Sequence, residues 1–206
     1  MEEIIKIGKN RLPVIIGTNG QTKRDIEKHT KTSLEIDSNT SEVNIVSDLS
    51  YYEIHQAKNV ISAIARGFSP EHAYKLLEDN YSYDVIDLTD YVSDSRDRHE
   101  QIKGRVIGRE GRVKQMIEKK NSCFLSIYGK TVAIIAPVDR IEDTREVIEK
   151  ILSGSKHTTI FKMLKRNTFK EQEDNKANKD YKKNEIDDID FNEEDESENK
   201  KTGEKK

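Results

Sequence analysis

Two glycine pairs with the same spacing are the residues best suited to chemistry in this chain. Gly17 and Gly20 form one pair, Gly108 and Gly111 form the other, and a polar helical pattern follows each. Glycine permits a sharp turn and lets a ligand approach the backbone closely. A helix that begins after the second glycine presents unpaired N–H groups and the positive end of its dipole, which suit a phosphate group.

Basic and apolar neighbours extend both loops into candidate nucleic-acid sites. The isoleucine before each loop supplies an apolar wall on which unstacked bases can rest, while the basic residues attract the sugar-phosphate backbone. Lys103 and Arg105 precede the second loop and fit a solvated helix face equally well. The candidate RNA-binding residues are Ile16, Gly17, Thr18, Asn19, Gly20, Lys23, Arg24, Lys103, Arg105, Ile107, Gly108, Arg109, Glu110, Gly111, Arg112 and Lys114.

The surroundings of the two loops repeat, which predicts one module present twice. Placing Gly17 on Gly108 also aligns Ile26 with Ile117, and Leu34 with Leu125. Each copy reads β-α-α-β-β-α, an α+β fold with helices on one face of a sheet. The first copy is expected to have strands over 2–7, 33–37 and 42–46 and helices over 11–16, 21–29 and within 50–68. The second is expected to have strands over 83–92, 123–128 and 131–136 and helices over 98–107, 112–121 and within 138–154. Further helices are expected over 70–79 and 156–166.

Composition and charge divide the chain into a body and a tail. Residues 171–206 contain 14 acidic and 8 basic side chains, which leaves 25 acidic and 28 basic of the 39 and 36 in the whole chain. The tail has few apolar residues, so we expect it to be disordered. We therefore predict a first domain over 1–68, a connecting helix over 69–80, a second domain with a closing helix over 81–169, and a disordered acidic tail over 170–206.

The sequence also indicates in which cellular compartment the protein is expected. Cys123 is the single cysteine, so no internal disulfide can form. No apolar run approaches the roughly 20 residues of a membrane span, and the first residues lack the apolar segment of a signal peptide. We expect a soluble, cytoplasmic protein with no membrane partner.

The loop sequences resemble the signature of the KH domain. "VIGREGRVKQMIE" and "IIGTNGQTKRDI" each have an apolar pair, Gly-x-x-Gly, and an isoleucine six positions after the second glycine. Two such units, with the connector "SPEHAYKLLEDNY" and the closing segment "GSKHTTIFKMLKR", are similar to the archaeal tandem KH-domain ribosomal-RNA-processing proteins. Those are the counterparts of the eukaryotic "partner of Nob" small-subunit assembly factor, and the likeness extends from residue 1 to about 168.

The resemblance implies a fold of two tandem type I KH domains and a non-catalytic function. That function is binding of single-stranded small-subunit ribosomal RNA near the 3′ end of 16S rRNA, during ribosome assembly or rRNA maturation. The resemblance also implies two partners, the rRNA maturation endonuclease and the alpha subunit of translation initiation factor two. We expect a monomer. Thr18 and Asn19 carry no charge, and Glu110 partly offsets Arg109, so we expect the second loop to bind RNA more tightly than the first.

Catalysis is disfavoured by the residues that would have to perform it. The five histidines lie far apart without ligand spacing, and Cys123 has no cysteine partner for a zinc site. Asp84, Asp87 and Asp90 alternate along a predicted strand instead of pairing. We therefore predict no enzyme activity, no metal and no cofactor, and we expect Cys123 to be a core residue.

Two other readings remain open. The chain could be a protein-docking scaffold with little RNA affinity, because Tyr51, Tyr52, Ile54 and Ile61 place much apolar surface on one predicted helix; packing against the connector would explain the same residues. It could also bind RNA in transcription or decay, although the S1-type barrel usual in such proteins would need a run of five strands that the pattern lacks. Tyr128 is expected to cover the sheet in preference to stacking on a base.

Overall fold

The computed structural model describes residues 1–92 and 95–165, so the predicted tail over 170–206 lies outside the described residues. Met1–Ile160 form one compact unit, and the described end of the chain, Phe161–Lys165, belongs to a second unit. The elements of the first module (residues 1–68) are β1 (Glu2–Lys6), α1 (Leu12–Ile16), η1 (Thr18–Gly20), α2 (Gln21–Thr30), β2 (Ser33–Asp37), β3 (Glu42–Val46) and α3 (Tyr51–Ala65).

The second module (residues 81–154) has the same order of helices and strands. The connector (residues 69–80) contains α4 (Pro70–Ala73) and η2 (Tyr74–Leu77). The second module contains β4 (Tyr81–Asp87), η3 (Leu88–Asp90), α5 (Arg96–Ile107), η4 (Arg109–Gly111), α6 (Arg112–Asn121), β5 (Phe124–Tyr128), β6 (Thr131–Pro137) and α7 (Ile141–Leu152). A further helix begins at His157 and is described as far as Lys165.

Two elements differ from the sequence-based expectation. The strand expected over 83–92 ends at Asp87, whose side chain accepts the backbone N–H of Thr89 at 2.9 Å and turns the chain into η3. Asp favours such local turns because its carboxylate competes with the strand for backbone donors. The helix expected over 70–79 is divided into the short elements α4 and η2.

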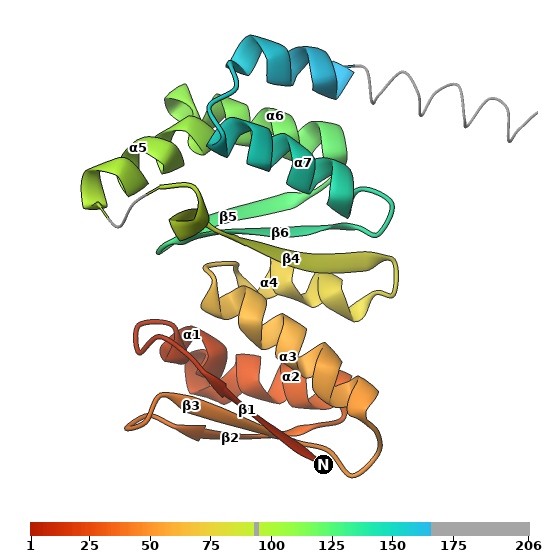
Figure 1. Ribbon diagram of the computed structural model, residues 1–206. Coiled ribbons are helices and arrows are strands. Elements are labelled where there is room, and N and C mark those ends of the chain that lie inside the picture. The colour runs from red at the N-terminus through yellow and green to blue at the C-terminus, as the bar shows by residue number, and fades with distance from the viewer. Residues whose placement is uncertain (93–94, 166–206) are drawn as a thin grey trace, which may run out of the picture. The chain divides into compact units, whose positions relative to one another are not determined.

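Each module has a three-stranded antiparallel sheet. The strand order is β1-β3-β2 in the first and β4-β6-β5 in the second, so β2 and β5 are edge strands. Figure 1 shows α1, α2 and α3 along one face of the first sheet and α5, α6 and α7 along one face of the second. The helices of each module therefore position its glycine loop beside its sheet.

The two sheets differ in how their second faces are covered. In β3, Val43 and Ile45 are fully buried, while Asn44 between them is half-buried on the opposite face. In β6 every residue from Thr131 to Ala136 is buried. Ala133 and Ile135 belong to the hydrophobic core that also contains the α3 residues, and α4 lies against that face in Figure 1. A strand buried on both faces has a continuous apolar sequence, which explains why "TVAIIA" alternates only in part.

Candidate nucleic-acid interface

The two glycine loops have the same backbone conformation. Gly17 and Gly108 have φ angles of 73° and 72°, and the second glycines, Gly20 and Gly111, have 73° and 74°. The residue before each second glycine is also left-handed, with φ 53° at Asn19 and 55° at Glu110. Because asparagine is among the few non-glycine residues enriched there and glutamate is not, the turn itself, and not the residue preference, sets this geometry.

The first glycine of each loop is required by the helix that follows. A Cβ on Gly17 would lie 2.3 Å from Oγ1 of Thr22, and a Cβ on Gly108 would lie 2.3 Å from Cγ2 of Val113. Either contact is far inside van der Waals distance. The first glycine therefore lets the second helix pack against the loop.

The second glycine of each loop adjoins open space instead. The nearest atom to a Cβ on Gly20 is Nη1 of Arg24 at 3.4 Å, and the nearest to a Cβ on Gly111 is Nε2 of Gln115 at 3.8 Å. Neither Gly20 nor Gly111 supplies a side-chain cap to the helix it begins. The backbone N–H groups of Gln21 and Arg112 donate to the carbonyl oxygens of Thr18 and Arg109. The feature that suits a phosphate oxygen is therefore the positive dipole end of each helix, beside an open second glycine.

A carboxylate joins the second helix to the edge strand in each module. Glu118 accepts the backbone N–H of Leu125 at 2.9 Å, and Glu27 accepts that of Leu34 at 2.8 Å. Since backbone groups of a strand alternate in direction, the N–H of Ile127 points to the same free edge as that of Leu125. The edge therefore offers a backbone donor to a base lying in the groove. Sequence reasoning missed these glutamates, although they align with each other in the repeat.

The second loop carries more positive charge than the first. Arg109 is exposed and forms no ion pair with any residue in the described ranges. Arg112 lies 2.6 Å from Glu110, and both side chains are mostly exposed, so the pair is weak and can exchange for a phosphate. Lys114 lies 3.4 Å from Glu118.

The first loop has fewer charges near its tip. Thr18 and Asn19 are exposed and uncharged. Arg24 is exposed and donates to the side-chain oxygen of Gln21 at 3.4 Å, whereas Lys23 lies 3.7 Å from Glu27. The positive charge of this module therefore lies on α2 and not in the loop itself.

Each loop is preceded by an isoleucine, and the second loop is also preceded by two basic residues with partners of their own. Ile107 is 36% exposed and Ile16 is half-buried, so each presents apolar surface beside its loop. Lys103 pairs with Glu100 at 2.9 Å. Arg105 donates to the carbonyl oxygen of Ser155 at 2.7 Å, which ties α5 to the segment after α7. A phosphate contact by Arg105 would have to replace that hydrogen bond.

The cysteine and the groupings of possible metal ligands were two candidate sources of chemistry in the described part of the chain. Burial raises the pKa of the Cys123 thiol to about 12, so it is not a nucleophile at neutral pH. Within residues 1–92 and 95–165, no cluster of three or more histidine, cysteine or acidic residues could hold a metal ion. No helix in the same ranges is long and apolar enough to cross a membrane.

Comparisons with known proteins agree with this geometry. The family model described as a eukaryotic-type KH domain (KH-domain type I) matches residues 82–169, which contain the second loop and its groove. The KH domain-containing protein MJ0443 of Methanocaldococcus jannaschii is 39% identical over 166 residues, covering 80% of this chain and 73% of that protein. This chain belongs to that family of archaeal KH-domain proteins.

Similarity to solved structures identifies the family more specifically. Dim2p from Pyrococcus horikoshii OT3 is 43% identical with a TM-score of 0.75, covering 81% of this chain and 99% of that one. The a/eIF2α–aDim2p–rRNA complex from the same organism is 41% identical with a TM-score of 0.76, covering 82% and 95%. APE0754 from Aeropyrum pernix, described as of unknown function, is 29% identical with a TM-score of 0.81, covering 86% and 95%. The chain is thus a member of the Dim2p family, the counterpart of the eukaryotic partner of Nob, whose members are RNA-binding ribosome-assembly factors.

Proposed function

We propose that this protein binds single-stranded small-subunit rRNA near its 3′ end and holds it during maturation without catalysing a reaction. The observation that carries the proposal is the second loop, whose uncapped helix N-terminus, exposed Arg109 and neighbouring edge strand stand together inside the region matched as a KH domain. The complex of aDim2p with rRNA supports RNA as the ligand.

The contacts divide into two kinds. The positive N-terminal end of α6, with the side chains of Arg109 and Arg112, attracts phosphate oxygens and fixes the position of the RNA strand. Bases lie in the groove between Ile107 and the free edge of β5, where the N–H of Ile127 can donate to a base edge. Recognition of sequence comes from the groove, while affinity comes mainly from the loop.

The first module is proposed to be a second type I KH domain. Its order of elements, its loop angles and its carboxylate link to the edge strand repeat those of the second module. Its weaker loop charge makes it the minor contributor to RNA affinity.

Fluorescence anisotropy on the full chain tests the proposal. We would compare a labelled RNA of the 16S 3′ end with a scrambled RNA, using wild type and the double variant Arg109→Asp with Glu110→Asp. We expect preference for the 3′-end RNA, and at least a tenfold loss in the variant, about 1.4 kcal/mol. Equal affinity for both RNAs would refute the 3′-end assignment, and unchanged binding by a folded variant would refute the loop as the phosphate site.

A protein partner is the second part of the proposal. Leu49 is 60% exposed, and Tyr51 and Tyr52 at the start of α3 are 57% and 55% exposed, which is unusual for neighbouring large apolar residues. These three residues are offered as a docking surface for the alpha subunit of initiation factor two, which shares a complex with a relative. The maturation endonuclease as a partner and the monomeric state stay predictions.

The docking surface is tested with the purified alpha subunit. Leu49→Ala with Tyr51→Ala is expected to weaken binding of that subunit at least tenfold in calorimetry, because exposed aromatic anchors dominate interface energies. RNA affinity should not change. An unchanged affinity for the subunit would remove this surface from the proposal.

A further inference from the structure

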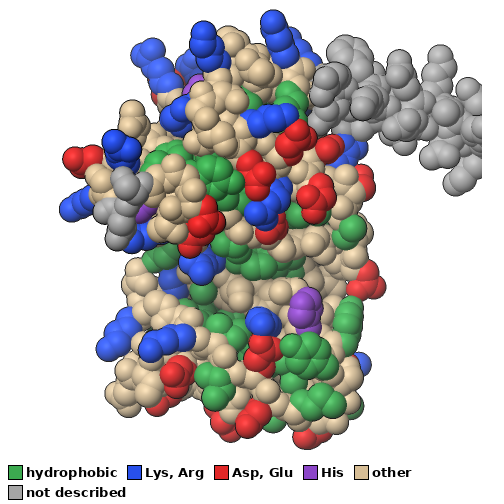
Figure 2. All heavy atoms as spheres, viewed as in Figure 1, with side chains coloured by type: hydrophobic (Ala, Val, Ile, Leu, Met, Phe, Trp, Pro, Cys, Tyr) green, Lys and Arg blue, Asp and Glu red, His purple; other side chains and the backbone are tan. Residues whose placement is uncertain are grey.

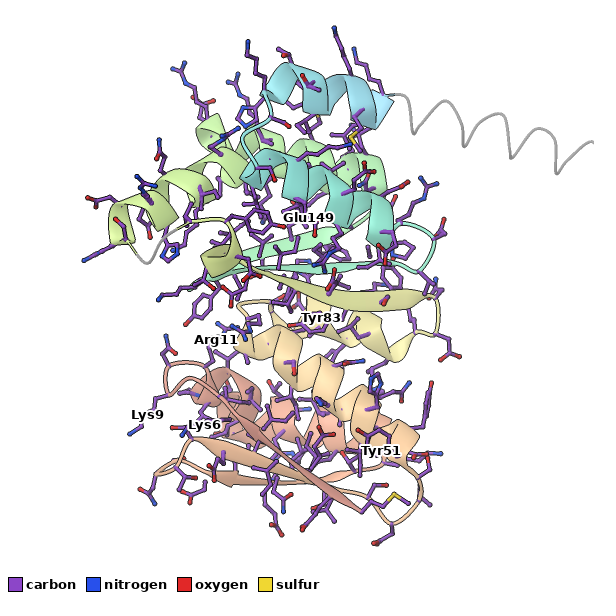
Figure 3. All side chains as sticks on the ribbon, viewed as in Figure 1. Lys6, Lys9, Arg11, Tyr51, Tyr83 and Glu149 are labelled. Carbon is purple, nitrogen blue, oxygen red and sulfur yellow. The ribbon has the colours of Figure 1, made fainter. Side chains whose placement is uncertain are left out.

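A cleft outside both glycine loops lies where the two modules meet. Its walls are the end of β1, the last turn of α3 and the hairpin between β5 and β6, represented by Lys6, Gly8, Arg66, Tyr128 and Gly129. Neither the glycine loops nor the edge-strand grooves described above include these residues. Figure 3 shows Lys6, Lys9 and Arg11 following one another from the end of β1 to the start of α1.

Hydrogen bonds between the first and second modules fix the walls of the cleft. The Ser126 hydroxyl donates to the carbonyl oxygen of Arg66 at 2.8 Å, and the Asn10 amide donates to the Tyr128 hydroxyl. Gly67 has a φ of 102°, and a Cβ there would lie 2.7 Å from the Ser126 hydroxyl oxygen. Only glycine therefore allows this approach. A cleft with such walls binds a ligand without first having to be ordered.

The cleft is electropositive. Lys6 and Arg66 line it and are exposed. Lys9 is exposed next to the lining residue Gly8, while the Arg11 guanidinium donates to the carbonyl oxygens of Ile64 and Phe68 and lies 5.7 Å from the centre of the Tyr128 ring. On the face seen in Figure 2, basic side chains also gather over α1 and α5 on the left of the view.

Acidic residues stand near the cleft but are not among the described residues that line it. Glu42 lies opposite Lys6 in the sheet. Hydrogen bonds from Thr89 lower the pKa of Asp87, and the nearby Arg66 and Lys130 add to that effect. The two charged side chains in the lining, Lys6 and Arg66, are both basic, which favours an anionic ligand.

The cleft continues the groove of the second module. Tyr128 ends β5, the edge strand that forms one wall of that groove, and Gly129 turns the chain at the mouth of the cleft. A strand of RNA that follows β5 past Ile127 reaches Tyr128 next. An extended nucleotide spans a distance comparable to two strand residues, so the next phosphates come within reach of the basic side chains.

We propose that this cleft is an additional RNA-backbone site, which takes the phosphates of the nucleotides next to those bound in the second groove. The inference rests on the proposed RNA-binding function and names a contact outside both loops. Lys6 and Arg66 are the phosphate ligands, and the half-buried side chain of Tyr128 is the surface that the adjoining nucleotide covers.

Binding of RNAs of two lengths tests this site. We would measure a 5-nucleotide and a 14-nucleotide RNA, both containing the same core sequence, against wild type and Lys6→Glu with Arg66→Glu. The matched control is Lys28→Glu with Lys119→Glu, which changes the net charge equally at exposed positions on α2 and α6. Lys6→Gln with Arg66→Gln serves if the charge-reversed protein does not fold.

The expected result is a loss of about tenfold for the longer RNA, less than twofold for the shorter one, and a shallower salt dependence. The control should change both RNAs equally and little. Equal losses for both lengths in the cleft variant, or no loss for the longer RNA, would overturn the site. Failure of wild type to bind either RNA would instead overturn the proposed function.

Discussion

The two modules share a backbone and differ in what surrounds it. The φ angles at three matched positions of the loops agree to within a few degrees, and both second helices lack a side-chain cap. The loop of the second module carries Arg109, whereas the loop of the first carries only Thr18 and Asn19. The comparison separates two requirements: glycines set the shape of the phosphate site, and the residues between them set its charge.

The sheets of the two modules also differ, in how their second faces are covered. The second face of the first sheet is open to solvent, with Asn44 between Glu35 of β2 and the exposed Ile4 of β1. The equivalent position in the second sheet is Ala133, which is fully buried beneath the first module and connector. His72 of the connector also stacks on Phe124 of β5, with ring centres 4.4 Å apart. The second sheet is thus covered on both faces, whereas the first is covered on one.

The largest effect is expected from the glycines that both modules require. Gly17→Ala and Gly108→Ala should each lower the free energy of unfolding by about 3 kcal/mol, because a left-handed residue and a 2.3 Å contact are both forced. Urea denaturation measures the change. Gly104→Ala is the control; it lies within α5 with open space around it and should stabilise by roughly 0.5–1 kcal/mol. Tolerance of Gly108→Ala alone would mean that the loops differ in shape.

A reciprocal exchange tests the difference between the sheets. Ala133→Asn should destabilise the protein by about 2 kcal/mol, since it buries an amide without a partner. Asn44→Ala should change stability by less than about 0.5 kcal/mol, because that position faces solvent on one side. Thermal denaturation of both variants gives the comparison. Equal costs would show that the second sheet is not covered in solution.

The carboxylate links should act alike in the two modules. Glu118→Gln and Glu27→Gln each weaken a charge-assisted hydrogen bond to a strand N–H, with an expected loss of about 1 kcal/mol. Glu71→Gln, at an exposed position on α4, is the control and should have no measurable effect. A loss in only one module would indicate that the two grooves are held together differently.

The smallest effect is expected from adding charge to the weaker loop. Thr18→Arg places a cation where the second loop has Arg109, and it should lower the Kd for RNA by about two- to threefold, since an exposed charge is screened. Thr18→Ser should leave the Kd unchanged. Anisotropy at two salt concentrations measures both. An unchanged Kd for Thr18→Arg would mean that RNA does not pass the first loop.

Much of the local structure follows from sequence, because periodicity and the repeat are local signals. The bounds of α6, β2 and β3 match the predicted ranges, and the repeat aligned both loops. Loop residues such as Gly108 could be singled out because glycine is the residue type that favours a positive φ angle.

Features that depend on packing between distant segments could not be predicted. Burial of Ala133 needs the connector to lie on the second sheet, and Arg105 reaches Ser155 only because α5 and α7 pack together. The junction cleft depends on Asn10 meeting Tyr128, two residues with no pattern in common. Such contacts depend on the three-dimensional fold and produce no periodic pattern in the sequence.

The most direct test compares the two loops in one experiment on the full chain. Thr18→Asp with Asn19→Asp and Arg109→Asp with Glu110→Asp each lower the net charge by two, and aspartate tolerates the left-handed conformation. With labelled 16S 3′-end RNA and folding checked by circular dichroism, we predict at least a tenfold loss of affinity for the second pair and less than about fivefold for the first. Equal affinity of both folded variants and wild type would contradict the claim that these loops hold RNA.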